Sequence, residues 1–198
     1  LKSINQYYNK QLATMKSKLP NGIYSSKEIR KLTQKRNHKI HNELHKMTTY
    51  IIDTCVKNDI TTVIVGVNKG WKQGVSIGKK NNQNFVSIPY YKARNMLKYK
   101  CQLVGITYVE VEENYTSKCS AMDLEPLVKQ QTYIGNRKHR GLFEYSSGCI
   151  NADINGSLNM IRKVAGNSVF VVNNAGKLVE GYAVSPQKVT ITFDSDIF

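Results

Sequence analysis

The stretch ITTVIVGVN at residues 60–68 limits the fold of this chain more than any other. It is β-branched and almost continuously apolar, which is typical of a strand buried on both faces of a sheet. A helical pattern follows at 87–105, and ITYVEVEE at 106–113 indicates a second strand. Strands joined through a helix form a right-handed parallel unit in nearly all known cases. The sequence therefore predicts an α/β fold with parallel strands.

Two helical patterns precede the first strand. Apolar residues recur at helical spacing from about 3 to 19 and again from about 26 to 57, and a Pro-Asn-Gly segment at 20–22 separates the two runs. Lys, Arg, His and Asn fill the other faces of the second run. We therefore expect a basic helical hairpin at the beginning of the chain.

The second half of the chain has a helical pattern at 153–164 and no clear periodicity at 114–150. Taken with the earlier patterns, this predicts a basic helical hairpin, a strand–helix–strand core, an irregular insertion, a final helix and a tail of unknown role. Their predicted boundaries are 1–58, 59–113, 114–150, 151–166 and 167–198.

The composition favours a polyanionic partner, with nucleic acid as the first candidate. The chain carries 29 Lys and Arg against 14 Asp and Glu, a formal net charge of +15. A membrane partner is not expected, because no apolar run approaches the roughly 18 residues of a spanning helix. The cysteines are widely spaced, as in a reduced intracellular protein; they are Cys55, Cys101, Cys119 and Cys149.

Two clusters of residues suggest metal sites that we do not favour. His38, His41 and His45 share one face of the long helix, and histidines at such spacing can bind a metal. Their basic neighbours attract phosphate instead, so we favour a solvated or nucleic-acid-facing stripe. A zinc ribbon at 115–149 would need a Cys-x-x-Cys pair at each end, whereas the chain has one cysteine at each end. We therefore expect no zinc, and a phosphate-contacting or merely solvated basic loop at 137–140.

The scarce acidic residues are placed where a site is expected. Glu110, Glu112 and Glu113 gather at the end of the second strand, and Asp153 begins the final helix. The carboxyl ends of parallel strands are where α/β proteins build their sites. Converging carboxylates hold Mg²⁺, and two such ions clamp the attacking and leaving oxygens of a phosphodiester. The alternative for Asp153 is an ordinary first-turn acid, which the helix dipole favours.

The motif NADINGSLNMIRK at 151–163, preceded by YTSKCS and RGLF, resembles the C-terminal part of the TnpB-type (OrfB) proteins of bacterial insertion sequences. These are RNA-guided DNA endonucleases with a RuvC-like domain of the RNase H fold, related to the type V CRISPR effectors. The resemblance covers most of the chain and is most specific at 115–163. It implies a partial RNase H-like (RuvC) domain after the basic hairpin, with a degenerate zinc-ribbon-like insertion held in place by packing alone.

The resemblance places Asp153 at the third acidic position of the RuvC-like site, as a Mg²⁺ ligand. The family's first aspartate lies on a strand before this chain begins, so we expect the fragment not to assemble the whole site by itself. The usual glutamate is absent from VIVGVNKG. Glu113, or next Glu112, is expected to reach the same metals across one strand spacing of about 4.8 Å. Gly156 and Ser157 are expected to let the helix pack close to the sheet, and the two flanking asparagines to orient the carboxylate or meet phosphate.

The resulting interpretation is part of a transposon-encoded, RNA-guided, Mg²⁺-dependent DNA endonuclease in the bacterial cytoplasm, associated with the nucleoid. Its expected partners are DNA and a guide RNA. A nuclease-dead nucleic-acid binder and an inactive fragment remain as alternatives. The residues expected to contact nucleic acid are cationic, with one tryptophan that either stacks on a base or packs in the core: Lys35, Arg36, Lys39, Lys69, Trp71, Lys72, Arg137, Lys138 and Arg140.

Overall fold

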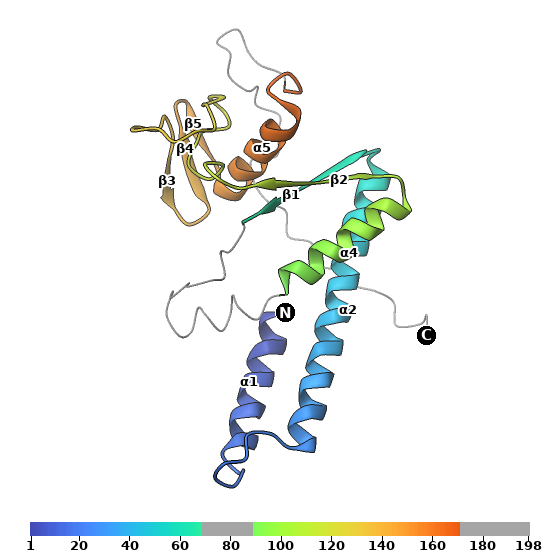
Figure 1. Ribbon diagram of the computed structural model, residues 1–198. Coiled ribbons are helices and arrows are strands. Elements are labelled where there is room, and N and C mark those ends of the chain that lie inside the picture. The colour runs from blue at the N-terminus through green and yellow to red at the C-terminus, as the bar shows by residue number, and fades with distance from the viewer. Residues whose placement is uncertain (69–88, 171–198) are drawn as a thin grey trace. The chain divides into compact units, whose positions relative to one another are not determined.

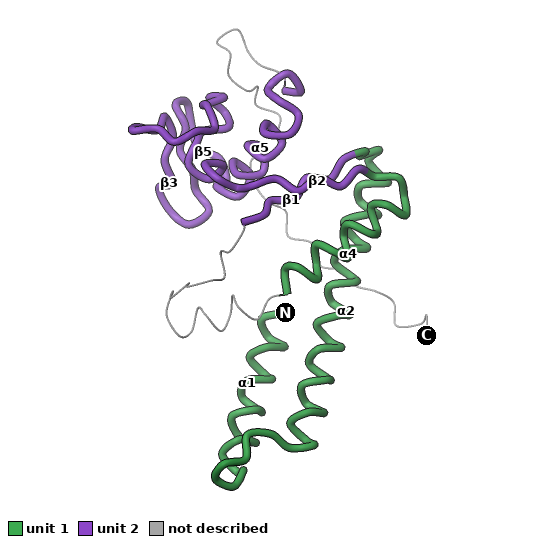
Figure 2. Tube along the Cα trace, viewed as in Figure 1, with its two compact units in different colours: residues 1–61, 71–106, 191–198 green, residues 62–70, 107–190 purple. Residues whose placement is uncertain are grey.

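The computed structural model describes residues 1–68 and 89–170. Within these ranges the chain forms two compact units, coloured separately in Figure 2. The first unit contains the helices of residues 1–61 and 89–106, and the second contains residues 62–68 and 107–170. The helix that follows the first strand therefore belongs to the first unit, with the helical hairpin, while both parallel strands belong to the second.

The first unit consists of α1 (Lys2–Lys16), α2 (Lys27–Lys57) and α4 (Tyr90–Leu103). The helix predicted at 26–57 is confirmed as α2, which begins after Ser26, whose hydroxyl accepts a hydrogen bond from the Ile29 amide at 3.3 Å. α1 ends before its predicted limit, because the residues after Lys16 continue as a turn with i to i+3 hydrogen bonds. α1 and α4 each pack on α2 (Figure 1).

The helices of the first unit are joined by both apolar and polar contacts. Ile40, Leu44 and Met96 form a buried cluster between α2 and α4. The Lys100 ammonium donates to the His45 carbonyl at 2.9 Å and to the Thr49 hydroxyl. Burial of this ammonium lowers the pKa of Lys100. Among the described residues, no helix combines the length and apolarity needed to cross a membrane.

The second unit begins with the predicted parallel pair. β1 (Thr62–Val67) and β2 (Thr107–Glu112) pair in parallel, in a register that places Gly66 opposite Val111. The final helix is confirmed as α5 (Ala152–Ala165), and it packs against both strands. The mixed α/β class and the parallel pairing are therefore as predicted.

The insertion at 114–150, predicted to be irregular, contains an antiparallel sheet. β3 (Asn136–His139), β4 (Leu142–Tyr145) and β5 (Gly148–Asn151) form it in chain order. Each strand has only four residues and β3 is exposed along its whole length, so no alternation of apolar and polar residues marks them in the sequence. Phe143 and Ile150 point from this sheet into a core shared with Leu158 of α5.

Polar side chains of α5 tie the insertion to the helix. Asn155 accepts from the Ala121 amide at 2.9 Å and donates to the Cys119 carbonyl at 3.0 Å. Asn159 donates to the Thr116 and Cys119 carbonyls at 2.9 and 2.7 Å. Both asparagine side chains are fully buried. The expectation that packing alone holds this segment is therefore wrong, because hydrogen bonds from buried amides also fix its backbone.

Candidate functional site

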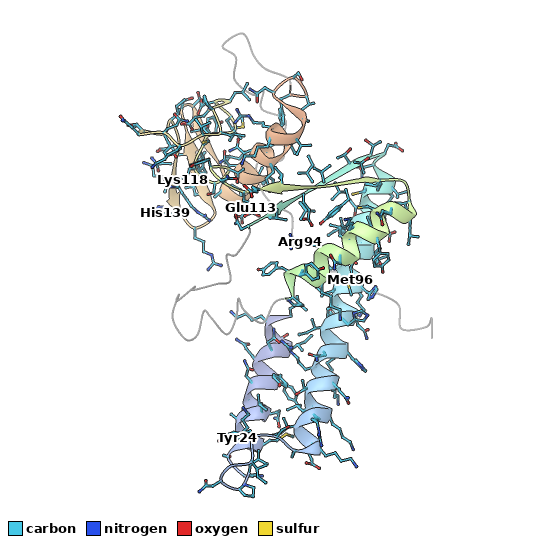
Figure 3. All side chains as sticks on the ribbon, viewed as in Figure 1. Tyr24, Arg94, Met96, Glu113, Lys118 and His139 are labelled. Carbon is cyan, nitrogen blue, oxygen red and sulfur yellow. The ribbon has the colours of Figure 1, made fainter. Side chains whose placement is uncertain are left out.

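The carboxylate of Glu113 lies at the carboxyl end of the parallel strands. Glu113 directly follows β2, and its backbone amide donates to the Val67 carbonyl at 3.3 Å. Its Oε2 accepts a hydrogen bond of 2.8 Å from the Asn68 side-chain amide, at the end of β1. The side chain of Glu113, labelled in Figure 3, is thereby directed toward the neighbouring strand.

Gly66 leaves the room that the Glu113 side chain occupies. A Cβ added at Gly66 would come within 3.0 Å of Glu113 Oε1 and Cγ, and 2.5 Å from the Met160 Sδ of α5. Any side chain at position 66 would therefore compete with Glu113 for this space. The strand segment in which the sequence lacks the usual acid is thus the segment that Glu113 covers.

The two acids of β2 are placed differently from Glu113. Glu110 and Glu112 are exposed, whereas Glu113 is partly buried. Glu112 accepts a hydrogen bond of 3.4 Å from Asn114, and Glu110 one of 2.9 Å from Tyr108. Neither contact is directed at β1. The structure therefore separates Glu113 from Glu112 by burial and by partner, although the two are adjacent in sequence.

Asp153 is exposed in the first turn of α5. The Asn151 side chain caps this helix, since its Oδ1 accepts from the Asp153 amide at 2.9 Å and from the Ile154 amide at 3.3 Å. Asp153 precedes Met160 by two turns on one helix face, about 10 Å along the axis. The part of the chain described here contains no group of three or more His, Cys, Asp or Glu residues that could hold a metal ion.

Two expectations about α5 are wrong. A Cβ on Gly156 would meet nothing within 4 Å, so this glycine does not serve close packing against the sheet. Asn155 is buried against the insertion, so its side chain does not face the Asp153 carboxylate, whereas the Asn151 side chain caps the helix through the Asp153 and Ile154 amides. Close packing against α5 instead requires Gly66, whose partners are Glu113 after β2 and Met160 of α5. Neither partner could be identified from the residues next to Gly66 in sequence.

The two glycines give a paired stability prediction. We expect Gly66→Ala to lower the free energy of unfolding by about 1–2 kcal/mol, since overpacking forces Glu113 and Met160 to move. Gly156→Ala should instead raise it by up to about 1 kcal/mol, because alanine is the better helix former and has open space here. Urea unfolding of both variants checks this, and equal signs for the two changes would contradict the described packing.

A cavity of about 320 Å³ lies between α1 and α2. Lys35, Arg36 and Lys39 all line it, together with tyrosines of α1. Arg36 is held internally, because its Nε and NH2 donate to Asn5 Oδ1 at 2.9 and 2.7 Å. Lys35 and Lys39 are exposed. The structure therefore brings these three predicted nucleic-acid contacts together on the hairpin, and of the three Lys35 and Lys39 are the exposed ones.

Two family models match the chain. Residues 1–72 match the family OrfB_IS605, described as "Probable transposase", and residues 90–160 match the family "Cas12f1-like, TNB domain". The TnpB-like protein ORF457 of the Acidianus two-tailed virus is 26% identical over 199 residues, which take in 92% of this chain. Together these matches support a TnpB-type protein.

The chain is also similar in fold to a solved structure. The cryo-EM structure of the Cas12f1–sgRNA–target DNA complex matches with a TM-score of 0.53 and 23% identity, over 78% of this chain. At this identity the likeness concerns the fold alone. The chain spans 40% of the length of the viral relative and 41% of that Cas12f1 chain.

The basic residues of the TNB-like segment lie on β3 and on the turn that follows it, not in a loop as predicted. Arg137, Lys138 and Arg140 are exposed. The Lys138 ammonium forms an ion pair of 2.8 Å with Glu144, which raises the pKa of Lys138. The remaining predicted contacts lie outside the described residues; they are Lys69, Trp71 and Lys72.

The histidines do not form the solvated stripe that we favoured. His41 and His45 are partly buried, and their Nε2 atoms lie 3.1 Å apart. Burial lowers the pKa of His45, and the nearby His41 and Lys100 add to this effect. Only His38 of the three is exposed. The pair therefore belongs to the packed junction between α2 and α4.

The cysteines of the TNB-like segment lie in different environments. Cys119 is fully buried with its Sγ 3.3 Å from the Pro126 carbonyl, whereas Cys149 is exposed on β5. Burial raises the pKa of the Cys119 thiol, which disfavours the thiolate that zinc requires. The residues described here therefore do not fit a zinc site at this position.

Proposed function

We propose that the chain is part of an RNA-guided, Mg²⁺-dependent DNA endonuclease with a RuvC-like site, in which Glu113 replaces the usual glutamate. The observation that carries the proposal is the Glu113 carboxylate, which lies over Gly66 at the carboxyl end of the parallel strands. A carboxylate at that edge of a parallel sheet is where an α/β enzyme builds its site.

The carboxylates fit Mg²⁺ in kind but not in number. Glu113 and Asp153 supply the oxygen ligands that Mg²⁺ prefers, and the described residues supply no group of three. We therefore assign both residues as ligands in a site that the remainder of the protein completes. When bound, Mg²⁺ would stabilise the charge that develops on a phosphodiester during hydrolysis.

The chain's own residues prepare this site. The Asn68 amide donates to Glu113 and fixes the direction of its carboxylate. The Asn151 cap fixes the first turn of α5, which carries Asp153. Lys163 of α5 donates from its ammonium to the Glu112 and Asn114 carbonyls at 2.8 and 2.6 Å. This contact holds the segment around Glu113 against the helix.

We propose that RNA and DNA are the partners. The net charge of +15 favours a polyanion, and the Cas12f1 chain with the related fold is solved in complex with an sgRNA and a target DNA. The exposed cations of the hairpin and of β3 are the proposed backbone contacts. They carry no base-specific information, which a guide RNA would supply by pairing.

The test is DNA cleavage by the full-length protein bound to its own RNA, with Mg²⁺ and with a chelator. We expect cleavage only with Mg²⁺. Asp153→Ala should lower the cleavage rate by roughly 100-fold or more, the usual effect of removing a group that stabilises charge in the transition state. Glu43→Ala removes an exposed carboxylate from α2 and should cut as the wild type does.

A second candidate function is nucleic-acid binding without cleavage. It is favoured by the lack of a three-carboxylate group among the residues that the structure describes. The same assay separates the two functions. If the wild-type protein binds its RNA and target but cuts the DNA with neither Mg²⁺ nor Mn²⁺, binding without cleavage is the function.

A further inference from the structure

The cavity between α1 and α2 has the size of a site for one small planar group. Its volume of about 320 Å³ lies at the lower end of the roughly 300–1,000 Å³ of ligand pockets. The residues that line it belong to α1 and α2, the paired helices in the lower part of Figure 1. Every residue that lines it belongs to the first unit.

One wall of the cavity is apolar and aromatic. Ile4, Tyr7 and Tyr8 of α1 face Leu32 of α2 across it. Tyr7 is 61% exposed, so most of its ring is available to a ligand. An exposed aromatic ring beside an apolar wall suits the face of a nucleobase, since every base has a π-face that stacks on such rings.

The second tyrosine of this wall, Tyr8, is fixed before any ligand binds. Its hydroxyl lies 3.1 Å from Thr33 Oγ1, which itself donates to the Ile29 carbonyl. The Arg36 guanidinium lies 5.5 Å from the Tyr8 ring centroid and is held in turn by Asn5. The wall is therefore preorganised, which reduces the entropy that a ligand must offset on binding.

The rim of the cavity is cationic. Lys35 and Lys39 are exposed on α2, one helical turn apart. Across residues 1–42 the sequence has ten Lys and Arg and a single acid, Glu28. The electrostatic field around the cavity therefore favours an anionic ligand such as phosphate.

We propose that this cavity receives one unstacked nucleotide of a single-stranded segment, with its base on Tyr7 and its flanking phosphates on Lys35 and Lys39. The proposal rests on the nucleic-acid binding proposed above and adds the class of ligand at the hairpin. A base within a duplex is paired and stacked on both faces, so its faces are not available to Tyr7, whereas a single strand presents its bases freely.

The test is fluorescence anisotropy of the 198-residue chain with fluorescein-labelled 12-nucleotide probes. The probes are single-stranded RNA, single-stranded DNA of the same sequence, and the duplex of each. Tyr7→Ala should weaken single-strand binding by about 5- to 150-fold, the range expected for one lost base stack. Duplex binding should change less than twofold, and Tyr7→Phe should bind as the wild type does.

Two matched controls separate the cavity from the rest of the basic surface. Tyr24, labelled in Figure 3 at the turn between α1 and α2, is 83% exposed and does not line the cavity. Tyr24→Ala should leave every affinity within twofold. Lys39→Ala should reduce the salt slope of single-strand binding by about 0.7, and by more than Lys31→Ala, an exposed change on α2 outside the cavity.

The outcomes are separable. A loss in Tyr7→Ala confined to RNA or to DNA assigns the nucleotide to that strand. Equal losses in Tyr7→Ala and Tyr24→Ala, or equal losses for single strand and duplex, would overturn the cavity site while leaving nucleic-acid binding in place. A wild-type chain that binds none of the probes would count against the proposed partners themselves. Circular dichroism of each variant verifies its fold, and Lys39→Ala gives an independent reading if Tyr7→Ala unfolds.

Discussion

Glu113→Gln is expected to abolish DNA cleavage by the full-length protein, with a loss of roughly 100-fold or more, whereas Glu112→Gln should cut at nearly the wild-type rate. The physical reason is the position of the two carboxylates. Glu113 is partly buried and hydrogen-bonded to Asn68 at the end of β1, whereas Glu112 is exposed and contacts Asn114. Only the first is held over the strand that lacks the usual acid.

Glutamine is the appropriate replacement because it keeps the shape of the side chain. Its amide oxygen can still accept from Asn68, so the packing over Gly66 should be preserved while the negative charge is lost. Binding of RNA and target should therefore equal that of the wild type, and only cleavage should fall. A sensitive Glu112→Gln beside an active Glu113→Gln would exchange the two assignments, and unaffected cleavage in both would exclude this pair of residues from the site.

The elements of the fold that the sequence predicted well are those with long periodic patterns. α2 and α5 have apolar stripes of helical period, and β1 is continuously apolar, so local residues suffice to recognise them. The four-residue strands β3, β4 and β5 have no such pattern. They are stabilised by cross-strand pairing and by Phe143 and Ile150 packing on α5, which are contacts between residues distant in sequence.

The candidate site was predictable only in part for the same reason. The position of Asp153 at the start of a helix follows from its motif, and the clustering of glutamates after β2 is visible in the sequence. Which glutamate turns toward β1 depends on Asn68 and on the space above Gly66, and neither can be read from residues 110–113. A missed signal was available in α5, where Asn155, Asn159 and Arg162 recur at helical spacing and mark a buried polar face.

That buried polar face carries the second large effect, through Arg162. Its guanidinium is 6% exposed and donates to Asn159 Oδ1 at 2.7 Å, to the Glu125 carbonyl at 2.9 Å and to Asn167 Oδ1 at 2.8 Å. The Glu125 carboxylate, 1% exposed, accepts from the Ser120 and Ile134 amides at 2.6 and 2.8 Å. Together these residues connect α5 to the loop that precedes β3.

We expect Arg162→Met to destabilise the second unit by about 3–5 kcal/mol, the usual cost of removing one member of a buried charged network. The change leaves Asn159 Oδ1 and the Glu125 carbonyl without this donor, and it removes a guanidinium charge that interacts with the buried Glu125. The expected destabilisation is a property of the second unit and does not depend on the first unit. Amide hydrogen exchange at Ser120 and Ile134 measures it locally, and both amides should exchange at least about 100-fold faster.

Arg140→Met is the matched control, because Arg140 is exposed in the turn after β3 and its replacement should change exchange at these amides by less than threefold. A chelator should leave the wild-type protection unchanged if buried hydrogen bonds organise the segment. Loss of protection on chelation, or an Arg162→Met variant that exchanges as slowly as the wild type, would show that something other than Arg162 holds it. Cys119 lies beside this network with its thiol against backbone carbonyls, so the same measurement reports whether Glu125 and Arg162, rather than a bound metal, hold this part of the insertion.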